Sequence, residues 1–171
     1  MAKAAKPKST PAPAAKAKAK APKRPKGIHV LTPYLVCRDA PAAIAFYKKA
    51  FGATEMDRMP GPDGRLINAR LQIGGSSVML MEEMADYGSL SPKSLKGTPV
   101  TIHLYVDDVD AFVARAVKAG AVVKMPVADM FWGDRYGQFE DPFGHSWSAA
   151  TYLRSPSQAE MMAAMRKGPS G

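Results

Sequence analysis

The chain contains one pattern twice, and this internal repeat limits the possible folds more than any other feature. Residues 35–53 run from an apolar strand through Asp39 into a stretch with helical periodicity. Residues 104–121 repeat this order around Asp108, and a Gly-Ala pair closes both stretches. Each copy would have one apolar face to bury, so we expect two similar units that share one core.

The repeat extends beyond the helices. When Gly64 is aligned with Gly133, residues 73–78 fall opposite residues 142–147 without a gap. An Asp before each helix and a Gly after it are typical of helix ends, and alternating apolar residues indicate strands. Each unit therefore reads as strand, helix and three strands. The expected strands are 30–36, 53–59, 66–73 and 77–81 in the first unit and 100–106, 121–125, 135–140 and 145–152 in the second, with helices from Asp39 to Gly52 and over 109–119.

Strand alternation predicts which side chains face the helices. In strand 100–106 the apolar Ile102, Leu104 and Val106 belong under the helix, which leaves three residues on the opposite face: Thr101, His103 and Tyr105. In strand 66–73 the opposite face receives Leu66, Asn68, Arg70 and Gln72. We therefore predict an α+β fold in which two βαβββ units pair into an open eight-stranded barrel-like sheet, with the helices outside and a partly polar cup inside.

The positive charge of the chain is confined to its beginning. The net charge is +9, and residues 1–27 hold eight lysines and Arg24 without any acidic residue, so the remaining residues are balanced at fifteen basic and fifteen acidic side chains. This Lys/Ala/Pro-rich tail has almost no apolar side chain to bury, and we expect it to be disordered. It could bind nucleic acid through phosphate contacts, or it could be a solubilising leader.

The sequence divides into three parts: the tail at 1–27, a folded region at 28–153 with units 28–83 and 98–153, and a short C-terminal helix and tail at 154–171. No apolar stretch of about 18 residues exists to span a membrane. Cys37 is the sole cysteine, which fits a reducing compartment, so we expect a cytoplasmic protein. We expect Cys37 to be a small buried residue rather than a nucleophile, and His145 to bond a backbone group.

Several motifs resemble a known family. Phe51-Gly52 ends the first helix, residues 132–136 read Trp-Gly-Asp-Arg-Tyr, and residues 141–147 read Asp-Pro-Phe-Gly-His-Ser-Trp. In the duplicated frame these motifs resemble the vicinal oxygen chelate superfamily, and within it the glyoxalase and bleomycin-resistance type proteins, over residues 28–153. The resemblance implies paired units, often in homodimers, that bind a small molecule or chelate a substrate on a divalent metal.

The resemblance also implies where metal ligands would lie, on the first and last strand of each unit. The matching positions hold Thr32, Met79, Thr101 and Ser148. None of these is a strong ligand for a divalent ion, so we expect no metal. A weaker alternative is a divalent metal recruited by His103 and Glu82 together with a substrate oxygen.

The candidate ligand-binding residues combine cup-facing positions with the aromatic motif: Tyr34, Asn68, Arg70, Gln72, His103, Tyr105, Trp132, Arg135 and Ser148. Aromatic faces suit a flat ligand. Arg135 could grip a carboxylate or phosphate of that ligand, or it could pair internally with Asp134 or Asp141.

Three functions follow from these residues. The first is a homodimeric protein that binds a small aromatic or amphipathic molecule in the cup without metal. The second is a divalent-metal-dependent lyase, isomerase or dioxygenase, and the third is a nucleic-acid-associated protein that acts through its basic tail.

Overall fold

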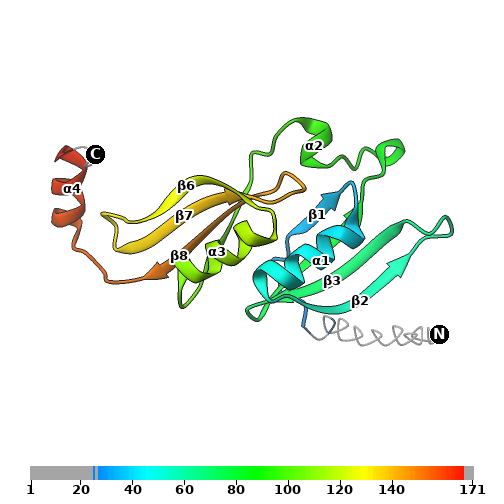
Figure 1. The fold of residues 1–171 in the computed structure, drawn as a ribbon, viewed down its shortest axis with the longest axis horizontal. Coiled ribbons are helices and arrows are strands. Elements are labelled where there is room, and N and C mark those ends of the chain that lie inside the picture. Colours follow the sequence, from blue (N-terminus) through cyan, green and yellow to red (C-terminus); the bar gives the residue numbers. More distant parts are fainter. Residues whose placement is uncertain (1–24, 26, 168–171) are drawn as a thin grey trace, which may run out of the picture.

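A computed structural model describes residues 25 and 27–167, which form two βαβββ units joined by a linker (Figure 1). The first unit contains β1 (Tyr34–Cys37), α1 (Ala40–Phe51), β2 (Thr54–Pro60), β3 (Leu66–Ile73) and β4 (Ser76–Glu82). The second contains β5 (Thr101–Tyr105), α3 (Val109–Ala119), β6 (Val122–Asp129), β7 (Asp134–Glu140) and β8 (Ser146–Tyr152). The predicted repeat is thus confirmed element by element. The tail predicted at 1–27 lies almost wholly outside the described residues.

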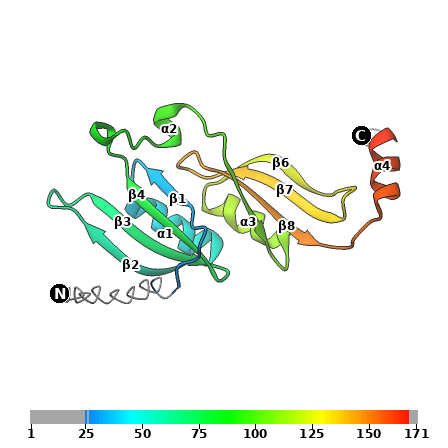
Figure 2. The same cartoon turned by 180° about the vertical axis from the view of Figure 1, so that it is seen from behind.

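Both units use the same strand order. The first sheet runs β1-β4-β3-β2 and the second β5-β8-β7-β6, with the first strand of each unit parallel to the last. This confirms the α+β class and two four-stranded sheets. The predicted pairing into one eight-stranded barrel-like sheet is not confirmed, because no strand of the described residues joins the two sheets. Residues of both edge strands, β1 and β5, line one groove where the units meet, and Figure 2 shows the two sheets on either side of this region.

The two helices begin and end through the same local interactions. The carboxylate of Asp39 accepts a hydrogen bond from the amide of Ala42 at the start of α1, and that of Asp108 accepts one from Ala111 at the start of α3. Each cap satisfies a backbone N–H that has no partner within the helix. The repeated Asp therefore sets the start of both helices, as the sequence predicts.

The helices bury their aromatic faces in one core that both units share. The rings of Phe51 on α1 and Phe112 on α3 stack with centroids 5.2 Å apart, and α1 and α3 lie side by side in Figure 1. Trp147 on β8 contacts Phe51 with ring centroids 4.8 Å apart and is fully buried. Helix α1 of the first unit thus packs directly against the sheet of the second, so neither unit has a complete core alone.

A buried carboxylate fixes this contact between the units. Oδ2 of Asp141 accepts hydrogen bonds from the Tyr47 hydroxyl at 2.6 Å and the Trp147 indole N–H at 2.9 Å. Its Oδ1 accepts from the amides of Phe143 and His145, both at 2.9 Å. Four donors on two oxygens compensate the loss of water around a buried charge. Asp141 therefore shapes its own turn and holds α1 to the second sheet.

His145 adds a second link between the units. Its Nε2 lies 3.2 Å from the carbonyl oxygen of Val36 on β1, which confirms the predicted bond to a backbone group. Burial lowers the pKa of this imidazole, with an opposing effect of the nearby Asp141 carboxylate. Cys37 lies 3.7 Å from the same nitrogen and is 0% exposed, and burial raises the pKa of its thiol well above the ordinary value. The thiol is a buried packing group, as predicted, because a nucleophile requires an accessible thiolate.

The predicted strand faces are largely confirmed. Ile102 and Leu104 pack against the core, whereas Thr101, His103 and Tyr105 are exposed on the opposite face of the second sheet. We call this opposite face of each sheet the open face. In β3 the alternation differs at one end, because Leu66 is buried in the core rather than on the open face. The register between β2 and β3 shifts beside Pro60, which pairs with Leu66, and this interrupts strict alternation.

The remaining elements are short. The linker contains a 3-10 turn (Ala85–Tyr87) and α2 (Pro92–Leu95), and α4 (Gln158–Lys167) stands clear of the sheets in Figure 1. The side chains of Ser157 and Glu160 each accept a hydrogen bond from the other's backbone amide, and this capping box starts the predicted C-terminal helix. Within the described ranges, no helix is long and apolar enough to cross a membrane.

We expect Asp141→Ala to lower the free energy of unfolding by roughly 3–5 kcal/mol, because four buried donors lose their acceptor. Urea unfolding followed by far-UV circular dichroism measures this change. Asp86→Ala is the matched control: Asp86 is exposed in the linker, and its removal should change stability by less than about 0.5 kcal/mol. Equal losses in the two variants would contradict the role of Asp141.

Candidate ligand-binding site

The open face of the second sheet carries five aromatic rings in a continuous series. The Tyr105 and His103 rings meet edge to face at 4.8 Å, and His103 stacks on Tyr136 at 5.9 Å. Tyr136 contacts Trp132 at 5.6 Å, and Trp132 contacts Phe131 at 5.0 Å. We call these five residues the aromatic row. Tyr105 is 63% exposed, and His103 and Phe131 are exposed as well, whereas Trp132 and Tyr136 are half-buried, so part of the row offers ring surface to a ligand.

A carboxylate lies beside the aromatic row. Asp134, the first residue of β7, is buried, and its Oδ2 accepts hydrogen bonds from the Tyr105 hydroxyl at 3.0 Å and the Trp132 indole N–H at 3.1 Å. The bond to Asp134 raises the pKa of the Tyr105 hydroxyl. Sequence reasoning missed this residue as part of the site. Strand alternation could have indicated it. Phe139 is a core residue of the same strand, so Asp134, five positions earlier, must point to the opposite, open face.

Hydrogen bonds hold the other polar groups of this face. Nδ1 of His103 lies 2.8 Å from the hydroxyl of Ser148, so two predicted site residues are brought together. The amide of Gln138 donates to the Tyr136 hydroxyl at 2.8 Å. Each of these bonds fixes the orientation of a ring in the aromatic row, which reduces the entropy lost when a ligand stacks on it.

The loop that carries Trp132 is held by the segment after β8. The carbonyl oxygen of Gly133 accepts hydrogen bonds from the amides of Leu153 and Arg154, both at 3.0 Å. Gly133 has a φ of +99°, and a Cβ there would overlap the carbonyl oxygen of Arg154 and contact Pro156. Only glycine allows this approach, so the position of Trp132 depends on the chain that follows β8.

Arg135 does not join the aromatic row. Its guanidinium pairs with Asp110 of α3 at 2.5 Å and with Asp129 of β6 at 2.8 Å, on the helix side of the sheet. The internal partners predicted for it, Asp134 and Asp141, are therefore wrong. Arg135 and Phe139 lie four positions apart in β7 and therefore on the same face of the strand, so the side chain of Arg135 points toward the helix.

The predicted residues of the first unit lie on the open face of the other sheet. The Tyr34 hydroxyl donates to the carbonyl oxygen of Ile67 at 3.0 Å. Arg70 pairs with Asp57 on the neighbouring strand. Asn68 and Gln72 are half-buried on β3 beside Arg70. These groups form a second, more polar surface that does not contact the aromatic row within the chain.

The four positions where the fold would place metal ligands hold donors that suit a divalent ion poorly. The hydroxyls of Thr101 and Ser148 are already hydrogen bonded, to Ser146 at 3.0 Å and to His103 at 2.8 Å. Thr32 bonds the backbone oxygen of His29 and the side chain of Ser77, and Met79 offers only a thioether. Neutral hydroxyls and a thioether are weak ligands for such ions. The donor set therefore does not fit a metal centre.

The alternative pair of ligands does not converge either. The carboxylate of Glu82 accepts a hydrogen bond from the backbone amide of Leu66, and its neighbour across the strand pair is the buried Cys37. Glu82 thus points to the helix side of the first sheet, whereas His103 lies on the open face of the second. Among the described residues no group of three His, Cys, Asp or Glu side chains could hold an ion.

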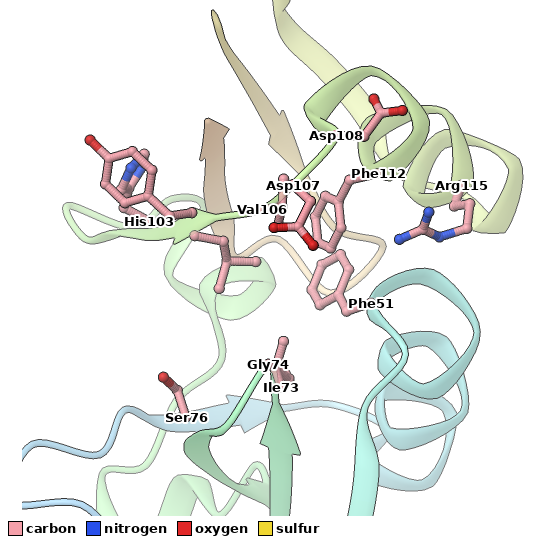
Figure 3. A pocket seen from close by; sticks show the side chains of 12 residues that line it. Phe51, Ile73, Gly74, Ser76, His103, Val106, Asp107, Asp108, Phe112 and Arg115 are labelled. Atoms are coloured by element: carbon pink, nitrogen blue, oxygen red, sulfur yellow. The ribbon is translucent and has the colours of Figure 1, made fainter. Parts of the chain in front are cut away.

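Two hollows flank β5 where the units meet. A seam pocket of about 690 Å³ includes His103, Ile73 and Asp107, with Phe51 and Phe112 side by side on its wall (Figure 3). A groove of about 610 Å³ runs between the free edges β1 and β5 and is largely apolar. His103 lines both, so it stands at the junction of the two hollows and the aromatic row.

Comparison with known proteins places this arrangement in context. The sequence pattern of the Glyoxalase/Bleomycin resistance protein/Dioxygenase superfamily matches residues 27–149. An uncharacterized protein of Mycobacterium tuberculosis (strain ATCC 25618 / H37Rv) is 53% identical over 138 residues, which cover 79% of this chain and 81% of the relative.

Solved structures resemble the fold as well. The crystal structure of TioX from Micromonospora sp. ML1 has a TM-score of 0.59 and 28% sequence identity, and the match covers 72% of this chain and 98% of TioX. The fosfomycin resistance protein FosX from Listeria monocytogenes, complexed with Mn(II) and sulfate ion, has a TM-score of 0.56 at 17% identity, covering 80% of this chain and 97% of FosX. The FosX likeness concerns the fold alone.

We expect Gly133→Ala to unfold more easily and to release Trp132 from Asp134, because the added methyl group displaces Arg154. Gly64→Ala is the matched control, since Gly64 has a similar φ of +82° and open space around it. Both variants lose about 1–2 kcal/mol from left-handed backbone strain, and Gly133→Ala should lose about 1–3 kcal/mol more. Urea unfolding gives the energies, and a red shift of tryptophan emission confined to Gly133→Ala reports the loop.

Proposed function

The chain belongs to the glyoxalase/bleomycin resistance protein/dioxygenase superfamily, and from this premise we propose that it binds a flat aromatic or amphipathic molecule on the aromatic row, as a homodimer and without a metal ion. The observation that carries the proposal is the row itself. Five contiguous rings, four of them oriented by side-chain hydrogen bonds and all at least partly open to solvent, form a stacking surface that core packing does not explain.

The chemistry of the donors supports binding without metal. The hydroxyls of Thr101 and Ser148 are engaged with neighbouring side chains, and Met79 is a thioether. His103 and Asp134 are the stronger ligand types on this face. Nδ1 of His103 is held by Ser148, and Oδ2 of Asp134 accepts from Tyr105 and Trp132. A divalent ion at this position would have to draw most of its ligands from water or substrate. Binding a small molecule without catalysis requires only side chains that contact it, and no metal ion.

A second copy of the chain would complete the cup. Each sheet presents its open face without a covering layer, and large apolar side chains are exposed along the meeting edges, among them Leu31, Val100 and Tyr105. Contiguous exposed apolar surface marks an interaction site. We place the polar face of one chain's first sheet opposite the aromatic row of its partner, so that Tyr34, Asn68, Arg70 and Gln72 would meet the ligand from the other side.

The binding proposal is tested with a panel of planar aromatic compounds by thermal shift and tryptophan quenching. We expect at least one compound to bind, and Trp132→Ala to weaken it about tenfold through loss of one stacking partner. Tyr87→Ala is the control, because Tyr87 is an exposed aromatic residue in the linker, away from the aromatic row.

The same protein tests the metal question. We expect neither chelator nor added Mn, Zn, Ni or Fe to change the melting temperature or the binding of the compound. Stoichiometric metal in the purified protein that disappears in His103→Ala would overturn the metal-free proposal and favour a metal-dependent enzyme. Absence of binding across the whole panel would overturn the binding function.

The homodimer is tested by light scattering, which should give a mass of about twice 18.3 kDa. Val100→Glu places a charge at the groove between β1 and β5, where Val100 is 62% exposed in the single chain, and should yield a monomer. Val117→Glu makes the same change on the outer side of α3, where Val117 is 44% exposed, and should remain a dimer. A monomeric parent protein at micromolar concentration would contradict this arrangement.

A further inference from the structure

Asp134 and Asp141 are both buried carboxylates on the second unit, and they differ in one respect. Asp141 has both oxygens occupied, by four donors in total. Asp134 is 6% exposed, yet only its Oδ2 has partners, the Tyr105 hydroxyl and the Trp132 indole. Among the described residues no donor reaches its Oδ1. This oxygen keeps contact with solvent, because no described buried side-chain oxygen is without a partner.

No cation of the described residues balances Asp134. Its neighbour Arg135 points to the helix side and is shared by Asp110 and Asp129. Arg154, which follows β8, pairs with Glu160. The two donors that Asp134 does have, the Tyr105 hydroxyl and the Trp132 indole, are neutral, so neither places a positive charge beside this carboxylate. A mostly buried carboxylate without a cationic partner gains favourable electrostatic energy when a cation binds beside it.

The rings beside Asp134 favour a cation as well. Tyr105 and Trp132 direct their polar edges at the carboxylate, and the Trp132 and Tyr136 rings meet at 76° with centroids 5.6 Å apart. A steep angle between two rings makes a corner whose faces both attract positive charge. The same negative surroundings repel a carboxylate or phosphate of a ligand, the group that Arg135 was expected to grip.

We propose that this corner selects its ligand by charge: a flat aromatic molecule binds with an organic cation, such as a quaternary or protonated ring nitrogen or amine, against Asp134 and the faces of Trp132 and Tyr136. The inference rests on the proposed function, since it names the class of molecule that the aromatic row takes. Asp134 is the residue that determines specificity, and the rings supply the contact area.

The test compares two probes of nearly the same shape, N-methylquinolinium, which is permanently charged, and quinoline, which is neutral near neutral pH. Dissociation constants are measured by calorimetry on the full chain. We expect the parent protein to bind the charged probe about tenfold more tightly than the neutral one. Asp134→Asn removes the charge while keeping an acceptor oxygen, and should lose this preference by weakening the charged probe alone.

Two further variants keep the result interpretable. Asp86→Asn removes an exposed carboxylate from the linker and should leave the preference unchanged. Tyr105→Phe removes one neutral donor from Asp134 but leaves its charge, so the preference should persist even if Asp134→Asn folds poorly. If Tyr105→Phe lost the preference for the charged probe, the hydrogen bond from Tyr105 rather than the charge of Asp134 would determine selectivity, and the inference would be overturned.

The outcomes separate this inference from the proposed function. Equal binding of the two probes by the parent protein would overturn charge selection and leave ligand binding on the aromatic row intact. Failure of both probes to bind at millimolar concentration would count against the proposed function itself. A preference that is identical in the parent and in a folded Asp134→Asn protein would place the cation elsewhere and overturn the role of Asp134.

Discussion

The rest of the structure depends on the buried carboxylate of Asp141. Its two oxygens take hydrogen bonds from Tyr47 of the first unit and Trp147 of the second, and from two amides of its own turn. This arrangement fixes α1 against the second sheet and thereby sets the distance between the sheet edges β1 and β5. The seam pocket, the groove and the relation of the two open faces all follow from how these units are joined.

The local features of the fold could be predicted from the sequence, because their causes lie within a few residues. Asp39 and Asp108 start helices through bonds to amides three positions away, and strand alternation places Trp147 inside. The candidate site was harder to predict, because it depends on contacts between residues far apart in the sequence. Tyr47 and Asp141 are 94 positions apart, and no local pattern shows that they meet. Arg135 was predicted to bind ligand because it lies in the Trp-Gly-Asp-Arg-Tyr motif. Strand alternation in β7 instead directs its side chain to the helix side of the sheet.

The chain keeps the duplicated βαβββ frame, and the four strand positions considered for a metal hold no strong ligand. Hydroxyls at Thr101 and Ser148 bond their neighbours, and the face beside them is covered by rings instead of strong metal ligands. The two sheets have the same strand order, yet one open face is polar and the other aromatic.

The shared core also has a consequence for synthesis on the ribosome. A nascent chain that ends within the linker holds every strand of the first sheet, but not Phe112, Trp147 or Asp141. The inner face of α1 then exposes Tyr47 and Phe51 until the last strand, β8, has left the exit tunnel. The first unit therefore exposes aromatic surface until the second unit has been synthesised. Nascent chains in such a state are prone to associate or to recruit chaperones.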